Sequence, residues 1–269
     1  MYRLLALDMD GTLLNSQKEI SPVTLEALKR LVGRGIAVAL CTGRGIAELD
    51  GYASELSFVP YGILNSGGCV YDFVKKRPLC QKLLDDEVLL QCLRAAKAVR
   101  AMPYLLFTDV SAGQTEDLRD VSVFRMGIYQ SLYDRIATAV PDLEEYVKSR
   151  PASSLKLCIF HRDEDTRNIT RAAISRFDLQ LSDAETTSLE ISPPGVTKAL
   201  GLQFLCDYLD IPIEETVAVG DADNDLDVLK AAGLSVAMGN ANDRVKQLCD
   251  VQVADNDHDG IAEVIDRFF

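Results

Sequence analysis

The chain has 269 residues, 48% of them hydrophobic and 26% charged, which is typical of a soluble globular protein with one large domain or two smaller ones. A formal net charge of −13 argues against nucleic acid and anionic membranes as partners, because both attract basic surfaces. The sequence holds no apolar run near the roughly 20 residues of a membrane span, and it reaches Asp8 too early for a signal peptide. We therefore expect a cytoplasmic location.

The seven cysteines are widely spaced and form no C-x-x-C pair, so neither a disulfide framework nor a cysteine-rich zinc site is expected. His161 and His258 are the two histidines, which leaves little material for histidine-centred catalysis. The chemistry of this chain is therefore expected to depend on other side chains.

The first 70 residues alternate between short apolar runs and a helical pattern. Leu4–Leu7 and Ile36–Leu40 are continuously apolar, as in parallel strands that are buried on both faces. Between them, Ser21 is an expected N-cap before Pro22, and Gly35 ends the helix. A third apolar stretch leads to a turn-forming cluster at residues 65–68.

The last 80 residues repeat this alternation of strands and helices. The expected helices are Val196–Leu209, Leu226–Ala232 and Ile261–Phe268, and the expected strands are Thr216–Val219, Ser235–Ala237 and Val251–Val253. Such alternation predicts an α/β fold with a doubly wound, Rossmann-like parallel sheet.

The middle of the chain has a different pattern. Partial alternation at Val121–Val123 and Leu155–Ile159 predicts strands of an antiparallel sheet, with helices expected at Asp86–Val99, Leu132–Val147 and Glu164–Phe177. We therefore expect an α+β domain over residues 85–186, inserted into an α/β core formed by residues 1–84 and 187–269.

Asp8 and Asp10 follow the first expected strand, in the segment Asp8-Met9-Asp10-Gly11-Thr12. Residues two apart in an extended segment point to the same side, beyond the carboxyl end of the strand, where α/β sheets bind ligands. Two carboxylates so close together need a cation, and Mg²⁺ prefers oxygen ligands. Gly11 allows a sharp turn whose amides can approach a phosphate.

A second acidic segment, Gly220-Asp221-Ala222-Asp223-Asn224-Asp225, follows the strand Thr216–Val219. One or two acidic residues at a helix N-terminus serve as caps, but three within five residues favour a metal site. Thr42, after the second strand, and Lys198, near a helix start, are weaker candidates for phosphate contacts when each is taken alone.

These segments occur in the order of the motifs of the haloacid dehalogenase superfamily, and the chain resembles its Cof-type phosphatases with a type IIB (C2) cap inserted after the third core strand. The resemblance implies that Asp8 is the nucleophile and Asp10 the general acid and base. It also implies a Mg²⁺ site, and the residues that it assigns are Asp8, Asp10, Asp221 and Asp225 for the metal and Thr42, Gly43, Lys198 and Asn224 for phosphate.

The sequence thus predicts a Mg²⁺-dependent phosphatase that hydrolyses a small phosphorylated metabolite, such as a sugar phosphate, a nucleotide or a phosphorylated cofactor, through an aspartyl-phosphate. A phosphohexomutase-like phosphoryl transferase and a non-catalytic phosphate sensor are the alternatives. Specificity is expected in the cap, where Arg125, Lys156 and His161 are polar candidates. The sequence leaves open whether the protein is a monomer or a homodimer.

Overall fold

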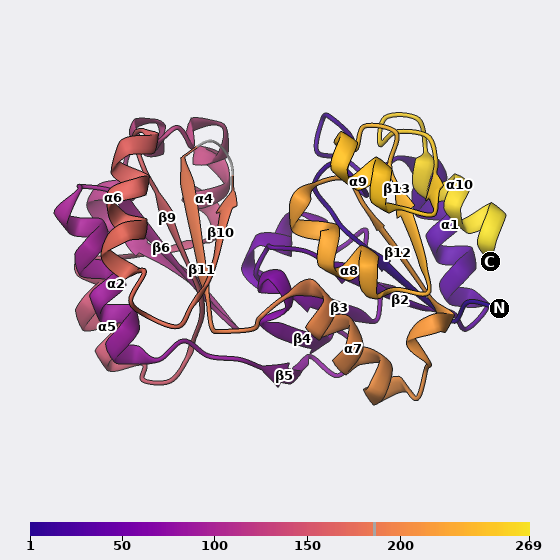
Figure 1. The fold of residues 1–269 in the computed structure, drawn as a ribbon, viewed down its shortest axis with the longest axis horizontal. Coiled ribbons are helices and arrows are strands. Elements are labelled where there is room, and N and C mark those ends of the chain that lie inside the picture. The colour runs from indigo at the N-terminus through magenta and orange to yellow at the C-terminus, as the bar shows by residue number, and fades with distance from the viewer. Residues whose placement is uncertain (185–186) are drawn as a thin grey trace. The chain divides into compact units, whose positions relative to one another are not determined.

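The computed structural model describes residues 1–184 and 187–269, which form two compact units (Figure 1). The core unit comprises Met1–Gly43, Tyr52–Cys80 and Thr197–Phe269, and the cap unit comprises Arg44–Gly51 and Gln81–Val196. The sequence predicted that the cap begins after residue 84 and ends at residue 186. The second of these boundaries adjoins residues outside the described part of the chain. A division of catalysis and specificity between core and cap stays a prediction.

An eight-stranded sheet, counted over the described residues, forms the centre of the core unit in the order β14-β13-β12-β1-β2-β3-β4-β5. Its strands are β1 (Leu4–Leu7), β2 (Ala37–Cys41), β3 (Tyr61–Leu64), β4 (Cys69–Asp72), β5 (Arg77–Gln81), β12 (Thr216–Gly220), β13 (Leu234–Ala237) and β14 (Val251–Gln252). Neighbouring strands run parallel from β14 to β3, and β4 is antiparallel to β3. The predicted doubly wound α/β sheet is confirmed.

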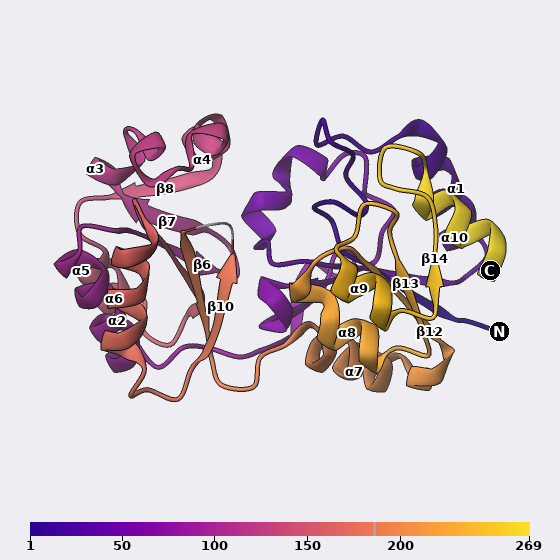
Figure 2. The same cartoon turned by 45° about the horizontal axis from the view of Figure 1, so that its top comes forward.

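Helices cover both faces of this sheet (Figures 1 and 2). On one face, the helices α7 (Lys198–Leu209), α8 (Leu226–Ala231) and α9 (Asp243–Leu248) belong to one apolar cluster with Leu4 and Ala6 of β1. On the other face, α1 (Pro22–Gly33) packs beside α10 (Gly260–Phe268). The central strands are buried on both faces, which explains their continuously apolar sequences.

The local signals for the first helix are confirmed. Ser21 is the N-cap of α1, and its Oγ accepts the Thr24 amide at 3.0 Å. Gly35 follows the helix with φ +81°. Short 3₁₀ segments complete the described connections: η1 (Ile46–Tyr52), η2 (Asn65–Gly67), η3 (Val121–Phe124), η4 (Gly127–Tyr129), η5 (Ile213–Glu215) and η6 (Asp223–Asp225). None of the described helices has the length and apolar character that a membrane span requires.

The cap unit contains a second sheet, in the order β10-β11-β9-β6-β7-β8. Its strands are β6 (Met102–Phe107), β7 (Ser111–Gln114), β8 (Ala137–Val140), β9 (Ser154–Phe160), β10 (Gln180–Ala184) and β11 (Ser188–Ser192). The pairs are antiparallel except that β7 and β8 run parallel. The inserted part is therefore α+β, as predicted.

Helices α2 (Asp86–Ala98), α5 (Leu143–Ser149) and α6 (Glu164–Ile174) pack on one face of this sheet. The opposite face is covered in part by α3 (Thr115–Leu118), α4 (Gln130–Ile136) and η3. Figure 1 shows α2, α5 and α6 side by side along the first face.

Two sequence predictions in this unit were wrong. The segment Val121–Val123 lies in the 3₁₀ helix η3 instead of a strand, because Asp120 accepts hydrogen bonds from the amide and the hydroxyl of Ser122 at 3.1 and 2.5 Å. Leu132–Val147 is not one helix but α4, β8 and α5. Pro141 favours an extended residue before it, and Asp142 caps α5 by accepting the Glu144 amide at 2.8 Å.

The segment Arg44–Gly51 belongs to the cap unit, although it follows β2 directly in the chain. Asp50 Oδ2 lies 3.8 Å from Nε of Arg135. Burial raises the pKa of Glu48, and the positive charges of Arg44 and Lys156 oppose this shift. Asp50 and Glu48 of the segment therefore interact electrostatically with Arg135 and Lys156 of the same unit.

Candidate active site

The carboxyl ends of three neighbouring strands bring the predicted site residues of the core unit together. Leu7 of β1 lies opposite Leu40 of β2 and Val219 of β12. Asp8 follows β1 at once, and its amide donates to the carbonyl of Val219 at 3.1 Å. Asp221 comes directly after β12, so the two acidic segments meet at one edge of the sheet.

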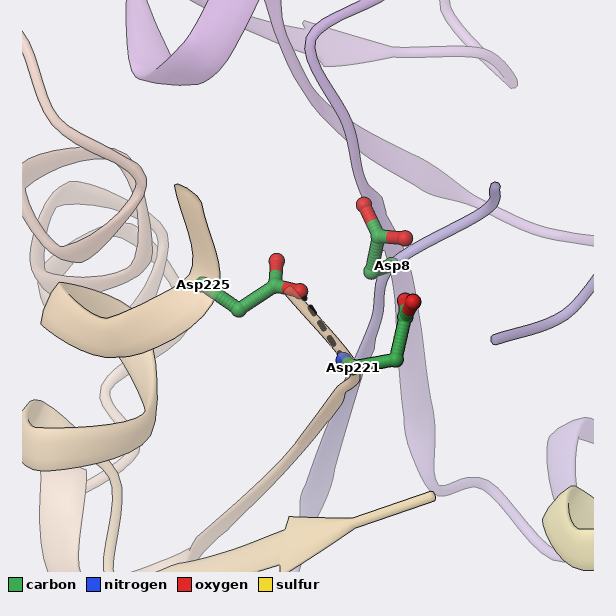
Figure 3. A group of neighbouring side chains, drawn as sticks. All are labelled: Asp8, Asp221 and Asp225. Carbon is green, nitrogen blue, oxygen red and sulfur yellow. Dashed lines mark hydrogen bonds between the residues drawn. The ribbon is translucent and has the colours of Figure 1, made fainter. Parts of the chain in front are cut away.

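Asp8, Asp221 and Asp225 form a cluster in which carboxylate oxygens of all three lie within 4.8 Å of one another. Figure 3 shows Asp225 reaching in from the turn that follows Asp221. Asp225 Oδ2 accepts the amides of Asp221 and Ala222 at 3.1 and 3.2 Å. The turn after β12 is thus folded around the buried carboxylate of Asp225.

Lys198 joins this cluster from the first turn of α7. Its ammonium donates to Oδ1 of Asp8 and to Oδ1 of Asp225, both at 2.6 Å, and the side chain is 1% exposed. Gly67 allows α7 to begin there, because a Cβ on Gly67 would lie 1.9 Å from the carbonyl oxygen of Thr197. The turn after β3 and the start of α7 therefore pack with their backbones in direct contact, which glycine permits.

Burial and like charges disturb the acid-base equilibria of the cluster. Burial, with the charge of Asp225 as the second cause, raises the pKa of Asp8 to about 8 and that of Asp221 to about 6. Burial alone would lower the pKa of Lys198, but the charges of Asp225 and Asp8 outweigh it and hold this pKa well above its usual value. The lysine therefore stays charged, whereas Asp8 and Asp221 take up protons more readily than exposed aspartates do.

The donor set fits a divalent cation. Three carboxylates and one ammonium carry a formal charge of −3 + 1 = −2, which two positive charges would cancel. The ligand atoms are all carboxylate oxygens, which hard cations such as Mg²⁺ prefer. The predicted residues Asp8, Asp221 and Asp225 are thus close enough to share one ion.

The loop after Asp8 is fixed against Asp221. Gly11 has φ +85°, and a Cβ there would lie 2.4 Å from Oδ2 of Asp221. Thr12 Oγ1 donates to Oδ1 of Asp221 at 2.9 Å, and Asn240 Nδ2 donates to the Gly11 carbonyl at 2.7 Å. Glycine at this position lets the loop pass directly over the carboxylate.

The other predicted site residues of the core unit have different environments. Asp10 follows Asp8 by two residues, and its side chain is 39% exposed with Oδ1 at 2.8 Å from Nζ of Lys18. Thr42 is buried at the end of β2, where its amide donates to the Ile63 carbonyl at 2.9 Å. Gly43 is half-buried, and Asn224 is exposed in η6.

The sequence assigned no role to three residues of this region: Lys18 contacts Asp10, Thr12 contacts Asp221, and Asn240 contacts the Gly11 carbonyl. Thr12 belongs to the segment Asp8–Thr12, so its place beside the site could be predicted from the sequence. The hydrogen bond from its hydroxyl to Asp221 could not. Lys18 and Asn240 lie in turns, where periodicity carries no information about the direction of a side chain.

The polar candidates of the cap unit are tied to their own unit. His161 is fully buried, with Nδ1 at 3.0 Å from the Thr187 carbonyl oxygen and Nε2 at 2.9 Å from Thr170 Oγ1. Lys156 is 1% exposed, with Nζ at 2.6 Å from Oε2 of Glu190. Arg125 Nε donates to the Arg162 carbonyl at 2.9 Å. The contacts of His161 are those of a structural histidine.

The chain is similar to known hydrolases over nearly its whole length. The family model described as haloacid dehalogenase-like hydrolase matches residues 5–265. The chain is 31% identical over 274 residues to 5-amino-6-(5-phospho-D-ribitylamino)uracil phosphatase YitU of Bacillus subtilis (strain 168), covering 99% of this chain and 97% of the relative. It is 28% identical over 277 residues to the chloroplastic endoribonuclease YBEY of Arabidopsis thaliana, covering 97% of this chain but only 45% of that relative.

A solved structure gives the same result for the fold. The crystal structure of a haloacid dehalogenase-like hydrolase from Bacteroides thetaiotaomicron matches with a TM-score of 0.88 and 28% identity, covering 100% of both chains. The match to the family model runs through both acidic segments and Lys198. The chain therefore belongs to the family of haloacid dehalogenase-like hydrolases.

Proposed function

We propose that this protein is a Mg²⁺-dependent phosphomonoester hydrolase that forms an aspartyl-phosphate on Asp8. The observation that supports the proposal most directly is the buried ammonium of Lys198, at 2.6 Å from Asp8 and also from Asp225. A carboxylate held beside a fixed positive charge at a strand end is suited to receive a phosphoryl group. The phosphatase name of the Bacillus relative agrees with this activity.

In the first step, a carboxylate oxygen of Asp8 attacks phosphorus while the bond from phosphorus to the alcohol oxygen breaks. Asp10 donates its proton to the departing oxygen. Lys198, already placed against Asp8, neutralises charge on the phosphoryl oxygens. Thr42, at the neighbouring strand end, donates its hydroxyl to the same group, with Gly43 and Asn224 as further phosphate contacts.

In the second step, water attacks phosphorus and the bond between phosphorus and the Asp8 oxygen breaks, which releases inorganic phosphate. Asp10, now a carboxylate, accepts the proton of the water. Asp10 can serve both steps because both reacting oxygens occupy the side of phosphorus opposite Asp8. In this scheme the protein ends the cycle with the protonation states in which it began.

Asp8 and Asp221 would hold the Mg²⁺ ion through carboxylate oxygens, with Asp10 through its backbone carbonyl. Asp225 would hold these ligands in place, because its buried carboxylate binds both the Lys198 ammonium and the Asp221 amide. When bound, the ion supplies positive charge that favours the ionised form of Asp8 and screens the phosphoryl oxygens.

The proposed substrate is a small phosphorylated metabolite, because the net charge of −13 disfavours polyanionic macromolecules. The Bacillus relative is named for a phosphorylated ribitylaminouracil, which is a compound of this class. We assign selection among such compounds to the cap unit, where Arg125 and Lys156 remain candidates for substrate contacts.

The test is phosphate release from a panel of phosphorylated metabolites with Mg²⁺, with EDTA, and with the Asp8→Asn variant. Release that requires both the metal and Asp8 is expected. Release by Asp8→Asn at the wild-type rate would refute the proposal. Accumulation of an isomer without phosphate would instead indicate a mutase, and binding of phosphate esters without turnover would indicate a sensor.

A further inference from the structure

The loop between β13 and α9 contacts both acidic segments of the site. The Asn242 amide donates to the Asp221 carbonyl at 3.1 Å. From the same loop, Asn240 Nδ2 donates to the Gly11 carbonyl at 2.7 Å. Asn240 is exposed, yet its side chain connects the segment after β1 with the loop that binds the Asp221 backbone.

The side-chain amide of Asn240 is fixed in one orientation. Its Oδ1 accepts the backbone amide of Asn256 at 3.1 Å, so Nδ2 is the end that faces Gly11. Among the residues that the structure describes, no other hydrogen-bond donor contacts the Gly11 carbonyl. Asn240 is therefore the side chain that orients this carbonyl.

The Gly11 carbonyl and the Thr12 amide belong to one peptide group. Gly11 has φ +85° and no Cβ, so its backbone can rotate more freely than that of a larger residue. The Thr12 amide donates to the Met9 carbonyl at 3.3 Å, which is longer than the 2.7 Å bond from Asn240. The shorter of the two bonds to this peptide group is thus the one from Asn240.

The orientation of this peptide group matters for Asp221. The buried Thr12 hydroxyl donates to Oδ1 of Asp221 at 2.9 Å, and the Gly11 backbone leaves no room for a Cβ beside Oδ2. Both carboxylate oxygens of Asp221 therefore lie against the Gly11–Thr12 segment. Rotation of the peptide group would displace that segment from the carboxylate.

We propose that Asn240 is a positioning residue, which fixes the Gly11–Thr12 peptide group and thereby holds the Asp221 carboxylate in place to bind Mg²⁺. This inference rests on the proposed function, in which Asp221 is a ligand of the ion. Loss of a residue that holds a metal ligand in place typically weakens metal binding about 10- to 100-fold.

The experiment measures the Kd for Mg²⁺ by isothermal titration calorimetry, on the full chain after treatment with EDTA and dialysis. We expect the Kd of Asn240→Ala to rise about 10-fold. Asn256→Ala is the matched control, because Asn256 Nδ2 donates at 2.8 Å to the carbonyl of Leu14, farther along the same segment. Asn256→Ala should keep the wild-type Kd.

A double variant tests whether Asn240 acts through Gly11. Because Gly11→Ala is expected to displace the backbone from Asp221 by itself, adding Asn240→Ala should raise the Kd less than about twofold further. A full additional increase would overturn the inference, as would a wild-type Kd for Asn240→Ala or an equal loss in Asn256→Ala. If the wild type bound no Mg²⁺ and released no phosphate from p-nitrophenyl phosphate, the proposed function itself would be wrong.

Discussion

The ammonium of Lys198 lies 2.6 Å from Oδ1 of Asp8, and both side chains are buried at the carboxyl edge of the core sheet. The proposed nucleophile is therefore paired with a fixed charge before any substrate arrives. The same ammonium also contacts Asp225, so one cation holds two carboxylates that would otherwise repel each other.

Removing this cation should destabilise the protein as well as inactivate it. In Lys198→Met, Asp8 and Asp225 lose their shared partner, and an uncompensated buried charge costs about 3 to 5 kcal/mol. Urea unfolding at pH 7 in EDTA measures the free energy of unfolding. Lys230→Met, which removes an exposed lysine from α8, should stay within about 0.5 kcal/mol of the wild type. A loss of the same small size for Lys198→Met would contradict the pairing.

Alanine variants of Gly11 and Gly35 can test whether the contact between the Gly11 backbone and Asp221 matters for activity. Their φ values are +85° and +81°, but a Cβ on Gly11 would lie 2.4 Å from Oδ2 of Asp221, whereas a Cβ on Gly35 would meet nothing within 4 Å. Both alanine variants pay a similar backbone cost of roughly 1 kcal/mol. Only Gly11→Ala should also displace the carboxylate.

We therefore expect Gly11→Ala to lower kcat on a phosphate ester at least about 100-fold, because small displacements of catalytic groups have effects of that size. Gly35→Ala should keep the wild-type kcat. Isothermal titration calorimetry with Mg²⁺ should show weaker binding for Gly11→Ala alone. Equal activity of the two variants would exclude the steric role assigned to Gly11.

The metal-free protein should become less stable as the pH rises from about 4 to 8. The pKa of Asp8 is about 8 in the folded protein but 3.8 without burial, so between these values the folded state binds a proton that the unfolded state lacks. Each pH unit in this window costs the folded state up to about 1.4 kcal/mol. Unfolding in EDTA at pH 5 and pH 8 measures the difference.

Asp8→Asn cannot ionise at this position and should lack that part of the pH dependence. Mg²⁺ should reduce the loss of wild-type stability at pH 8, because the cation favours the ionised carboxylate. If the free energy of unfolding changed with pH equally in the wild type and in Asp8→Asn, Asp8 would not titrate in this range.

His161 should make the protein less stable in acid. Burial lowers the pKa of His161 below 6.5, so the unfolded state takes up its proton first as the pH falls. The stability that depends on the neutral imidazole is complete above pH 6.5 and is lost as the pH falls through the folded pKa. Thermal unfolding of the wild type and of His161→Gln at pH 7 and pH 5 isolates this contribution, because the opposite effect of Asp8 is common to both proteins. His161→Gln should be the more stable of the two at pH 5 relative to its own stability at pH 7.

His258 provides the control for this experiment, because it is exposed and its pKa is raised by a hydrogen bond to Asp255. His258→Gln should be at least as sensitive to acid as the wild type, because the raised pKa of His258 favours the folded state at low pH. If His161→Gln also kept it in full, another group would be responsible.

The sequence predicted the core sheet well because strands buried on both faces leave an unmistakable apolar pattern. Leu4–Leu7 was predicted with its observed ends. The same pattern located Asp8, Asp10 and Asp221, since residues after parallel strands share one edge of the sheet. Comparison with known proteins confirmed the family that these motifs indicated.

The errors lie where short polar side chains decide the local conformation. In η3, hydrogen bonds to Asp120 override the alternation at Val121–Val123. Between α4 and α5, Pro141 and Asp142 interrupt a helical pattern of apolar residues. The pairing of Lys18 with Asp10 depends on a left-handed residue in an Asn15 turn, which no periodic pattern reports.

The position of Arg44–Gly51 in the cap unit has a consequence for chimaeras of this family. The chain passes between the two units at 43/44, 51/52, 80/81 and 196/197, so the cap unit is not one contiguous cassette. A graft that replaced only residues 81–196 with those of a relative would leave Glu48 and Asp50 facing foreign side chains in place of Lys156 and Arg135. A graft that is meant to keep the contacts within the cap unit therefore requires transfer of Arg44–Gly51 together with residues 81–196.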